Sequence, residues 1–143
     1  MSSRVRRSHI VGIELMAVIL VVEDEPLIRF LLSDELVDAG HTVIEAASAL
    51  EAIAVLGRCD HLDVMITDVD MPGGLSGIDL MKLVRSTRPE TSVWVASGRD
   101  VRSQIDPGVF FLPKPYDYRE LVYIVSERAH VRQVLATDQQ RSG

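Results

Sequence analysis

Short apolar runs alternate along this chain with longer segments in which apolar residues recur at helical spacing. Strands are expected at five short runs, namely Ala17–Val22, His41–Ala46, Leu62–Thr67, Ser92–Ala96 and Val109–Leu112. Helices are expected at about Pro26–Ala39, from Ser48 to Gly57, at Ile78–Ser86 and from Asp117 to about Ala129. This alternation is typical of successive βαβ units, so the pattern predicts an α/β fold on a parallel sheet.

The expected helices carry recognisable start and stop signals. Pro26 suits the first turn of the first helix, and Gly40 can end that helix in a left-handed conformation. Ser48 with Glu51, and Asp117 with Glu120, have the spacing of capping boxes, in which the side chain of each residue accepts a hydrogen bond from the backbone N–H of the other at the start of a helix. These signals place the helix boundaries independently of the apolar pattern.

Four of the apolar runs end in a reactive polar group. The first is followed by Glu23-Asp24, the third by Asp68, the fourth by Ser97 and the last by Pro113-Lys114. Parallel strands of one sheet end at the same edge, which is where open α/β sheets bind their ligands. Carboxylates, a hydroxyl and an amine are therefore expected to share one cleft.

The acids in this cleft indicate a cation and phosphate chemistry. Two carboxylates about 4 Å apart, such as Asp24 and Asp68, repel by roughly 4 kcal/mol at an intermediate dielectric. Oxygen ligands without histidine or cysteine favour Mg²⁺, which binds one or two carboxylates together with phosphate oxygens. Lys114 and Ser97 could then contact a phosphoryl group, and Asp68 is the candidate nucleophile because carboxylates form acyl phosphates.

The same residues resemble the receiver domain of two-component response regulators. The resemblance covers roughly Ala17 to Ala129 and is carried by four segments: Val21-Val22-Glu23-Asp24-Glu25-Pro26, Asp68-Val69-Asp70-Met71-Pro72, Ser97-Gly98 and Lys114-Pro115-Tyr116. It implies a flavodoxin-like, doubly wound sheet of five parallel strands in the order 2-1-3-4-5, with about five helices. It also implies that Asp68 accepts a phosphoryl group from a sensor histidine kinase or a phosphotransfer protein.

Further roles follow from the resemblance alone. Glu23, Asp24, Asp68 and the backbone carbonyl of Asp70 would hold Mg²⁺, while Ser97 and Lys114 would contact the phosphoryl group. Glu23 stands where an aspartate is commoner. Phe111 falls at the position of the switch aromatic, whose rotamer follows the movement of Ser97. The Lys114-Pro115 peptide is expected to be cis.

Two departures from the family pattern affect the region around the site. Only Gly98 to Gly108 is available for the fourth helix and its connections, so we expect that helix to be short or absent. The face that usually transmits the signal is altered with it. Asp70 and Arg99 are unusual residues near the site, and we hypothesise that they pair across its mouth and shield an acyl phosphate from water.

Composition and charge narrow the class of protein. The chain has 143 residues, 47% of them hydrophobic, and a net charge of -6, which fits one acidic globular domain and excludes a basic nucleic-acid surface. The single Cys59 cannot form an internal disulfide, and no apolar run approaches the roughly 20 residues of a membrane span. We therefore expect a cytoplasmic, stand-alone receiver at residues 16–130, between a flexible extension at 1–15 and a flexible tail at 131–143.

This receiver is expected to signal through protein contacts with an unidentified target, and it could form a homodimer. It is expected to catalyse only its own phosphorylation and slow dephosphorylation. Two alternatives remain open. Asp68-Val69-Asp70 also resembles the nucleophile and acid of haloacid dehalogenase-type phosphatases, although Glu23-Asp24 precedes it in the wrong order for that family. The chain could also be a scaffold that binds partners independently of phosphorylation.

Overall fold

The computed structural model describes residues 4–6 and 17–141, with the backbone alone for residues 130–137. The helices are α1 (Pro26–Asp38), α2 (Ala49–Leu56), α3 (Gly77–Thr87), the 3₁₀ turn η1 (Arg102–Gln104) and α4 (Tyr118–Arg141). The strands are β1 (Arg4–Arg6), β2 (Val18–Val22), β3 (Thr42–Ala46), β4 (Val64–Asp68), β5 (Ser92–Ser97) and β6 (Phe110–Pro113). Each of the five strands predicted from the apolar runs is present.

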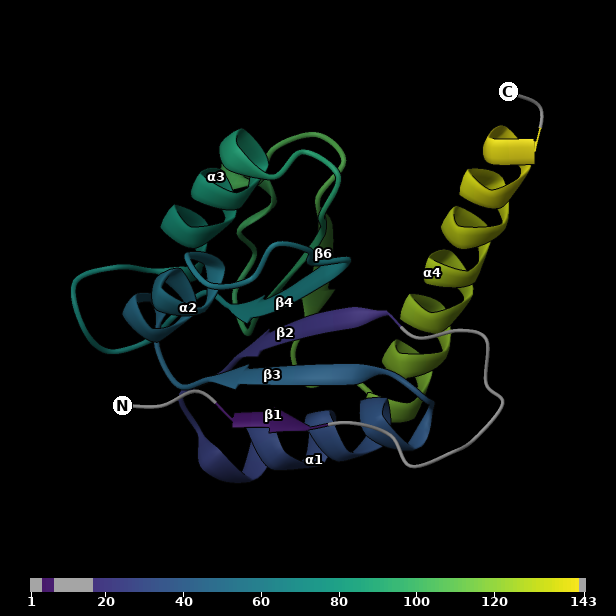
Figure 1. The fold of residues 1–143 in the computed structure, drawn as a ribbon. Coiled ribbons are helices and arrows are strands. Elements are labelled where there is room, and N and C mark those ends of the chain that lie inside the picture. Colours follow the sequence, from purple (N-terminus) through teal and green to yellow (C-terminus); the bar gives the residue numbers. More distant parts are fainter. Residues whose placement is uncertain (1–3, 7–16, 142–143) are drawn as a thin grey trace.

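The sheet has the predicted parallel core. Its strand order is β1-β3-β2-β4-β5-β6, and all neighbours except β1 and β3 run parallel (Figure 1). Without β1, this is the expected order 2-1-3-4-5. The order reverses at β2, so the crevice at the carboxyl ends of β2 and β4 is the expected ligand position for such a sheet.

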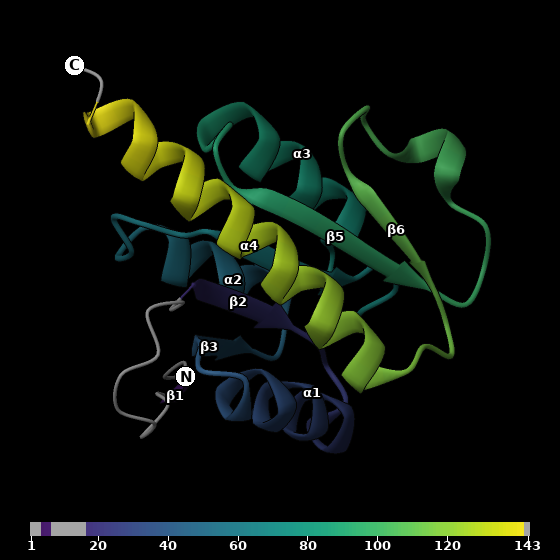
Figure 2. The same cartoon turned by 90° about the vertical axis from the view of Figure 1, so that its right-hand side faces the viewer.

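Helices cover both faces of the sheet and create two apolar cores. Alternate residues of each strand point to opposite faces, so Leu20 and Val22 pack with α2 and α3 while Ile19 and Val21 pack with α1 and α4. Figure 2 shows α1 and α4 on the near side of the sheet and α2 and α3 behind it. The central strands β2, β4 and β5 are buried on both faces, which explains why they read as nearly continuous apolar runs.

Local signals act where they were predicted. Pro26 lies at the start of α1, and Gly40 follows that helix with a left-handed φ of 101°. The Ser48 side chain accepts a hydrogen bond from the backbone N–H of Glu51 at 3.1 Å. Asp117 caps α4 by accepting hydrogen bonds from the N–H groups of Arg119 and Glu120. The Lys114-Pro115 peptide is cis, as the resemblance implied.

The structure corrects the prediction for the start of the chain. Arg4–Arg6, expected to belong to a flexible extension, forms an antiparallel sixth strand beside β3. Arg6 pairs with Asp34 of α1 at 2.7 Å and lies over the ring of Phe30, so its side chain is largely buried. A three-residue strand carries no periodic signal, and only its tertiary partners hold it. The rest of the predicted extension, residues 1–3 and 7–15, lies outside the described residues.

The structure also corrects the end of the last helix. Helix α4 continues to Arg141, whereas a flexible tail was expected from residue 131, and both views show it running on past the end of the sheet. The apolar stripe that packs on the sheet ends near Ala129, but no glycine or proline interrupts residues 130–141, so the helix has no local reason to stop.

Within the described residues, no helix is both long enough and apolar enough to cross a membrane.

The segment between Ser97 and Lys114 confirms the predicted shortening. Before β6 it contains only the turn η1, followed by Asp106, Pro107 and Gly108, which takes a left-handed φ of 88°. Val101 at the start of this turn is fully buried and anchors the segment on the α2 and α3 side of the sheet. A full fourth helix is therefore missing from this face.

Candidate functional site

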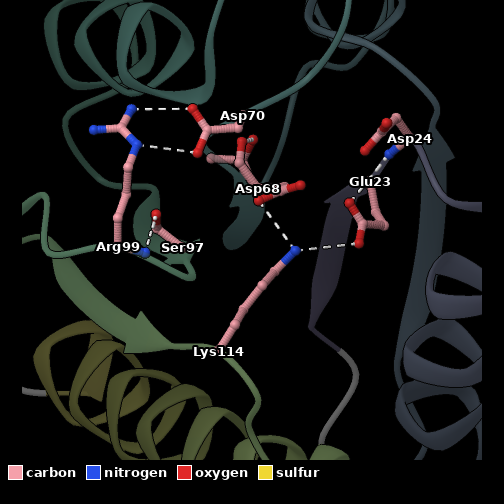
Figure 3. A network of polar contacts seen from close by, with 8 residues as sticks. Glu23, Asp24, Asp68, Asp70, Ser97, Arg99 and Lys114 are labelled. Atoms are coloured by element: carbon pink, nitrogen blue, oxygen red, sulfur yellow. Dashed lines mark hydrogen bonds and ion pairs between the residues drawn. The ribbon is translucent and has the colours of Figure 1, made fainter.

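The four polar groups predicted at the strand ends meet at one edge of the sheet. Figure 3 shows Glu23 and Asp24 after β2, Asp68 at the end of β4, Ser97 at the end of β5 and Lys114 after β6. The parallel register produces this convergence, because Val22 lies beside Thr67, Asp68 beside Ala96, and Ser97 beside Pro113. The predicted cleft is thus confirmed as a cluster of side chains.

Asp68 is held by its backbone surroundings. The next residue, Val69, donates its N–H to the carbonyl of Ala96 at 3.0 Å and accepts one from Gly77 at 2.9 Å. Helix α3 starts so close to Asp68 that a Cβ on Gly77 would lie 2.0 Å from the Asp68 carbonyl oxygen. Only glycine fits there. Sequence reasoning did not identify Gly77, although its place directly after the helix cap Ser76 was a usable signal.

Lys114 lies between two acids of the cluster. Its Nζ is 3.1 Å from Oδ1 of Asp68 and 3.5 Å from Oε1 of Glu23 (Figure 3). Partial burial opposes a charge on this amine, but the carboxylates of Asp68 and Glu23 outweigh it and raise the pKa of Lys114. The lysine therefore stays cationic and keeps one positive charge beside Asp68.

Glu23 carries the strongest electrostatic conflict of the site. Burial and then the negative charge of Asp68 raise the pKa of Glu23 to about 7, although Lys114 acts in the opposite direction. Arg29, which sequence reasoning overlooked, donates to the backbone carbonyl of Glu23 at 2.7 Å and fixes the chain there. One lysine thus does not neutralise this set of acids.

The acids fit a divalent cation. One carboxylate oxygen from each of Glu23, Asp24 and Asp68 lies within 4.8 Å of the others. Glu23 and Asp68 are buried, and the set contains only oxygen donors, as Mg²⁺ requires. A cation at this point would offset the repulsion by Asp68, which adds to burial in raising the pKa of Glu23. The predicted contribution of the Asp70 carbonyl stays a prediction.

Ser97 and Phe111 lie on the same face of the sheet. Ser97 is 2% exposed, and its Oγ accepts a hydrogen bond from the N–H of Arg99 at 3.1 Å. Phe111 pairs with Val95 in the parallel ladder and packs against the core on the α2 and α3 side. Because side chains two residues apart on a strand share a face, Ser97 lies on the same face as Val95 and its neighbour Phe111. The switch role of Phe111 remains a prediction.

Asp70 and Arg99 pair beside the cluster, as hypothesised. The Arg99 guanidinium donates from Nε to Oδ2 at 3.2 Å and from Nη2 to Oδ1 at 3.0 Å (Figure 3). The hydrogen bonds from Arg99 lower the pKa of the Asp70 carboxyl below its ordinary value. The pairing is confirmed, while the shielding of an acyl phosphate remains to be tested.

Comparison with known proteins assigns the chain to a family. A sequence profile of the response regulator receiver domain matches residues 19–126, which is most of the chain. The chain belongs to the response regulator receiver family. This membership favours the receiver interpretation over the phosphatase alternative, and it agrees with the order of motifs along the chain.

The receiver has relatives in larger signalling proteins. It is 34% identical over 118 residues to the response regulator protein FleR of Pseudomonas aeruginosa, covering 79% of this chain and 24% of FleR. It is 33% identical over 117 residues to the sensor kinase CckA of Brucella abortus, covering 78% of this chain and 12% of CckA. The chain thus spans a quarter or less of these two relatives.

A solved structure shows the same fold with a ligand. The response regulator TrrA of Thermotoga maritima, in complex with Mg²⁺-BeF, superposes on this receiver with a TM-score of 0.66 and 29% identity. The match covers 78% of this chain and 98% of TrrA.

Proposed function

We propose that this receiver accepts a phosphoryl group on Asp68 in a reaction that depends on Mg²⁺. The observation that carries the proposal is the position of Asp68, which shares its cluster with the acids Glu23 and Asp24 and lies 3.1 Å from Lys114 Nζ. An ordinary buried ion pair would need no third and fourth charged partner. The set as a whole matches what phosphoryl transfer to a carboxylate requires.

The chemistry assigns a role to each group. One carboxylate oxygen of Asp68 attacks the phosphorus of a phosphohistidine, a P–O bond forms, and the P–N bond breaks with its electrons on the imidazole. Glu23 and Asp24 would hold the cation, which would neutralise charge on the transferred oxygens when bound. Lys114 donates to one phosphoryl oxygen and Ser97 to another. Because Lys114 is already paired with Asp68, its ammonium group is in place to stabilise the negative charge of the transferred phosphoryl oxygens.

The donor and the recipient of the signal belong to the same proposal. A sensor histidine kinase or a phosphotransfer protein supplies the phosphoryl group, and a protein target recognises the phosphorylated surface. Phosphorylation shifts an equilibrium between two conformations through Ser97 and Phe111. The chain catalyses only its own phosphorylation and slow dephosphorylation. Its membership in a family shared by FleR and the sensor kinase CckA supports this assignment.

The proposal is tested by incubating the chain with acetyl phosphate or phosphoramidate in the presence of Mg²⁺. Intact-mass measurement is expected to show a gain of one phosphoryl group that is stable in acid and labile in base. Asp68→Asn is expected to lose this gain, because an amide is a poor nucleophile. Chelation of Mg²⁺ should also abolish it.

A matched variant controls for general damage. Asp60 is an exposed aspartate in the loop before β4, at the opposite edge of the sheet, so Asp60→Asn should keep the mass gain. Persistence of the gain in Asp68→Asn would contradict the assignment of the acceptor. Partner binding that is identical with and without beryllofluoride would instead support the phosphorylation-independent scaffold.

A further inference from the structure

An ion pair ties together the two loops that flank the acceptor. Asp70 lies in the loop after β4, and Arg99 lies in the loop after β5. Their two hydrogen bonds, at 3.0 and 3.2 Å, form a bidentate contact that fixes the orientation of the guanidinium as well as its distance. The contact therefore restrains how the β5 loop can move relative to Asp68.

The same arginine also holds the hydroxyl that must reach a phosphoryl group. The backbone N–H of Arg99 donates to Ser97 Oγ at 3.1 Å, closing a tight turn over Gly98. Ser97 is thus attached to Arg99, and Arg99 is attached to Asp70. A displacement of Ser97 therefore also moves the backbone of Arg99 and changes the geometry of its bidentate contact with Asp70.

We propose that Asp70 and Arg99 are positioning residues that latch the Ser97 turn in its unphosphorylated conformation. The proposal rests on the function proposed above and adds a restraint on its switch. Breaking the ion pair lowers the cost of moving Ser97, so the active conformation becomes more populated before any phosphorylation. The latch acts on the equilibrium and takes no part in the chemical step.

The size of the effect follows from exposure. The side chains of Arg99 and Asp70 are 56% and 61% exposed, so solvent and salt screen their attraction. Exposed pairs of this kind shift an equilibrium by roughly two- to fivefold. Salt is expected to weaken the latch in the wild type and to have less effect once the pair has been removed.

A second ion pair in the same loop offers a matched control. Arg102 pairs with Asp100 at 2.8 Å, and these side chains are 71% and 61% exposed. This contact lies within one loop and does not connect β5 to β4. Arg102→Gln therefore removes the same charge from the same segment while leaving the proposed latch intact.

The experiment compares Arg99→Gln, Asp70→Asn and Arg102→Gln with the wild type in two measurements. The first is amide hydrogen exchange at Gly98 and Arg99 in the unphosphorylated chain. The second is the affinity for beryllofluoride with Mg²⁺, measured at low and high salt. Both latch variants are expected to exchange faster and to bind beryllofluoride about two- to fivefold more tightly. Arg102→Gln is expected to match the wild type in both measurements.

The two variants separate a latch from simple attraction of an anion. If Arg99 only attracts the negative ligand, Arg99→Gln weakens binding while Asp70→Asn strengthens it, and this opposite pair of signs overturns the proposal. Unchanged exchange in both variants overturns it as well. A wild type that binds no beryllofluoride contradicts the proposed function, and hydrogen exchange alone then decides whether the latch exists.

Discussion

Asp24 shows how much of the site depends on the charge of single residues. Its carboxylate completes a set of three acids within 4.8 Å, while Lys114 contacts only Asp68 and Glu23. The set therefore holds more negative charge than its lysine can neutralise, and the charge of Asp68 adds to burial in raising the pKa of Glu23. Substitutions of these acids should therefore lower the affinity of the site for a cation.

Asp24→Asn is expected to weaken Mg²⁺ binding, because the amide supplies no charge to a cation that prefers carboxylates. The affinity should fall by about tenfold or more, since changes outside the ligand set already cost roughly 10- to 100-fold. Isothermal titration calorimetry with MgCl₂ measures it. Glu25→Gln is the control, since this exposed neighbour lies outside the cluster. Equal affinities for both variants would exclude Asp24 as a ligand.

The ion pair of Asp70 and Arg99 is expected to shield phosphorylated Asp68 from water. If the paired Asp70 and Arg99 limit the access of water to phosphorylated Asp68, then Asp70→Asn and Arg99→Ala shorten the lifetime of the acyl phosphate severalfold. The rate is measured as loss of the phosphoryl mass gain after removal of the donor. A dephosphorylation rate unchanged in both variants would refute shielding.

Among the elements, helix α3 has the tightest relation to the site. Its first residue, Gly77, brings the helix against the backbone of Asp68, and the capping box of Ser76 and Asp79 fixes where the helix begins. The helix start and the acceptor strand therefore position each other. Sequence reasoning placed this helix one residue later and did not recognise that box.

Gly77→Ala is expected to destabilise the fold by about 1–3 kcal/mol or more, because the added Cβ would overlap the Asp68 carbonyl. Phosphorylation from acetyl phosphate should fall with it as Asp68 is displaced. Urea denaturation measures the first effect. Gly57→Ala is the control, since a Cβ there meets its neighbours at 3.6 Å and causes no overlap. A Gly77→Ala variant as stable as Gly57→Ala would contradict the close approach.

At the scale of the whole molecule, His41 connects elements that are distant in sequence. Its Nδ1 accepts a hydrogen bond from the N–H of Ala17 before β2, and its Nε2 lies 2.7 Å from the hydroxyl of Ser126 on α4. Burial lowers the pKa of His41, although the negative charge of Asp63 acts in the opposite direction. The neutral imidazole is thus part of the folded state.

The contribution of His41 to stability is therefore expected to fall in mild acid. Because the pKa of His41 is lower in the folded chain than the ordinary value of 6.5, the unfolded chain binds more protons at this residue below that pH. Glu23, whose pKa is raised to about 7 in the folded chain, acts in the opposite direction over the same range. Urea denaturation from about pH 7 to about pH 5, compared between the wild type and a variant without the imidazole, isolates the contribution of His41.

A His41→Gln variant should be less stable than the wild type at neutral pH, and this difference in the free energy of unfolding should shrink as the pH falls toward about 5. His61→Gln, a change at an exposed histidine, should retain the pH dependence of the wild type. A difference between the His41 variant and the wild type that does not change with pH would remove His41 as the cause.

The apolar pattern by itself determined the parallel sheet, the faces of the helices and the acids, hydroxyl and amine at the strand ends. These features are local, since burial on two faces dictates continuous apolar strands and parallel strands end at a common edge. The family resemblance added the roles of these groups. It also led to the prediction of the short segment before Lys114.

Only the tertiary structure decided the features that depend on partners far along the chain. Arg4–Arg6 became a strand because β3 offered an open edge and Asp34 a counter-ion, neither of which is visible from its own three residues. Gly77 was required by a backbone it meets only after folding. The residue types at the strand ends were thus predictable from the local sequence. Their spacing in the site is set by contacts between distant segments of the chain.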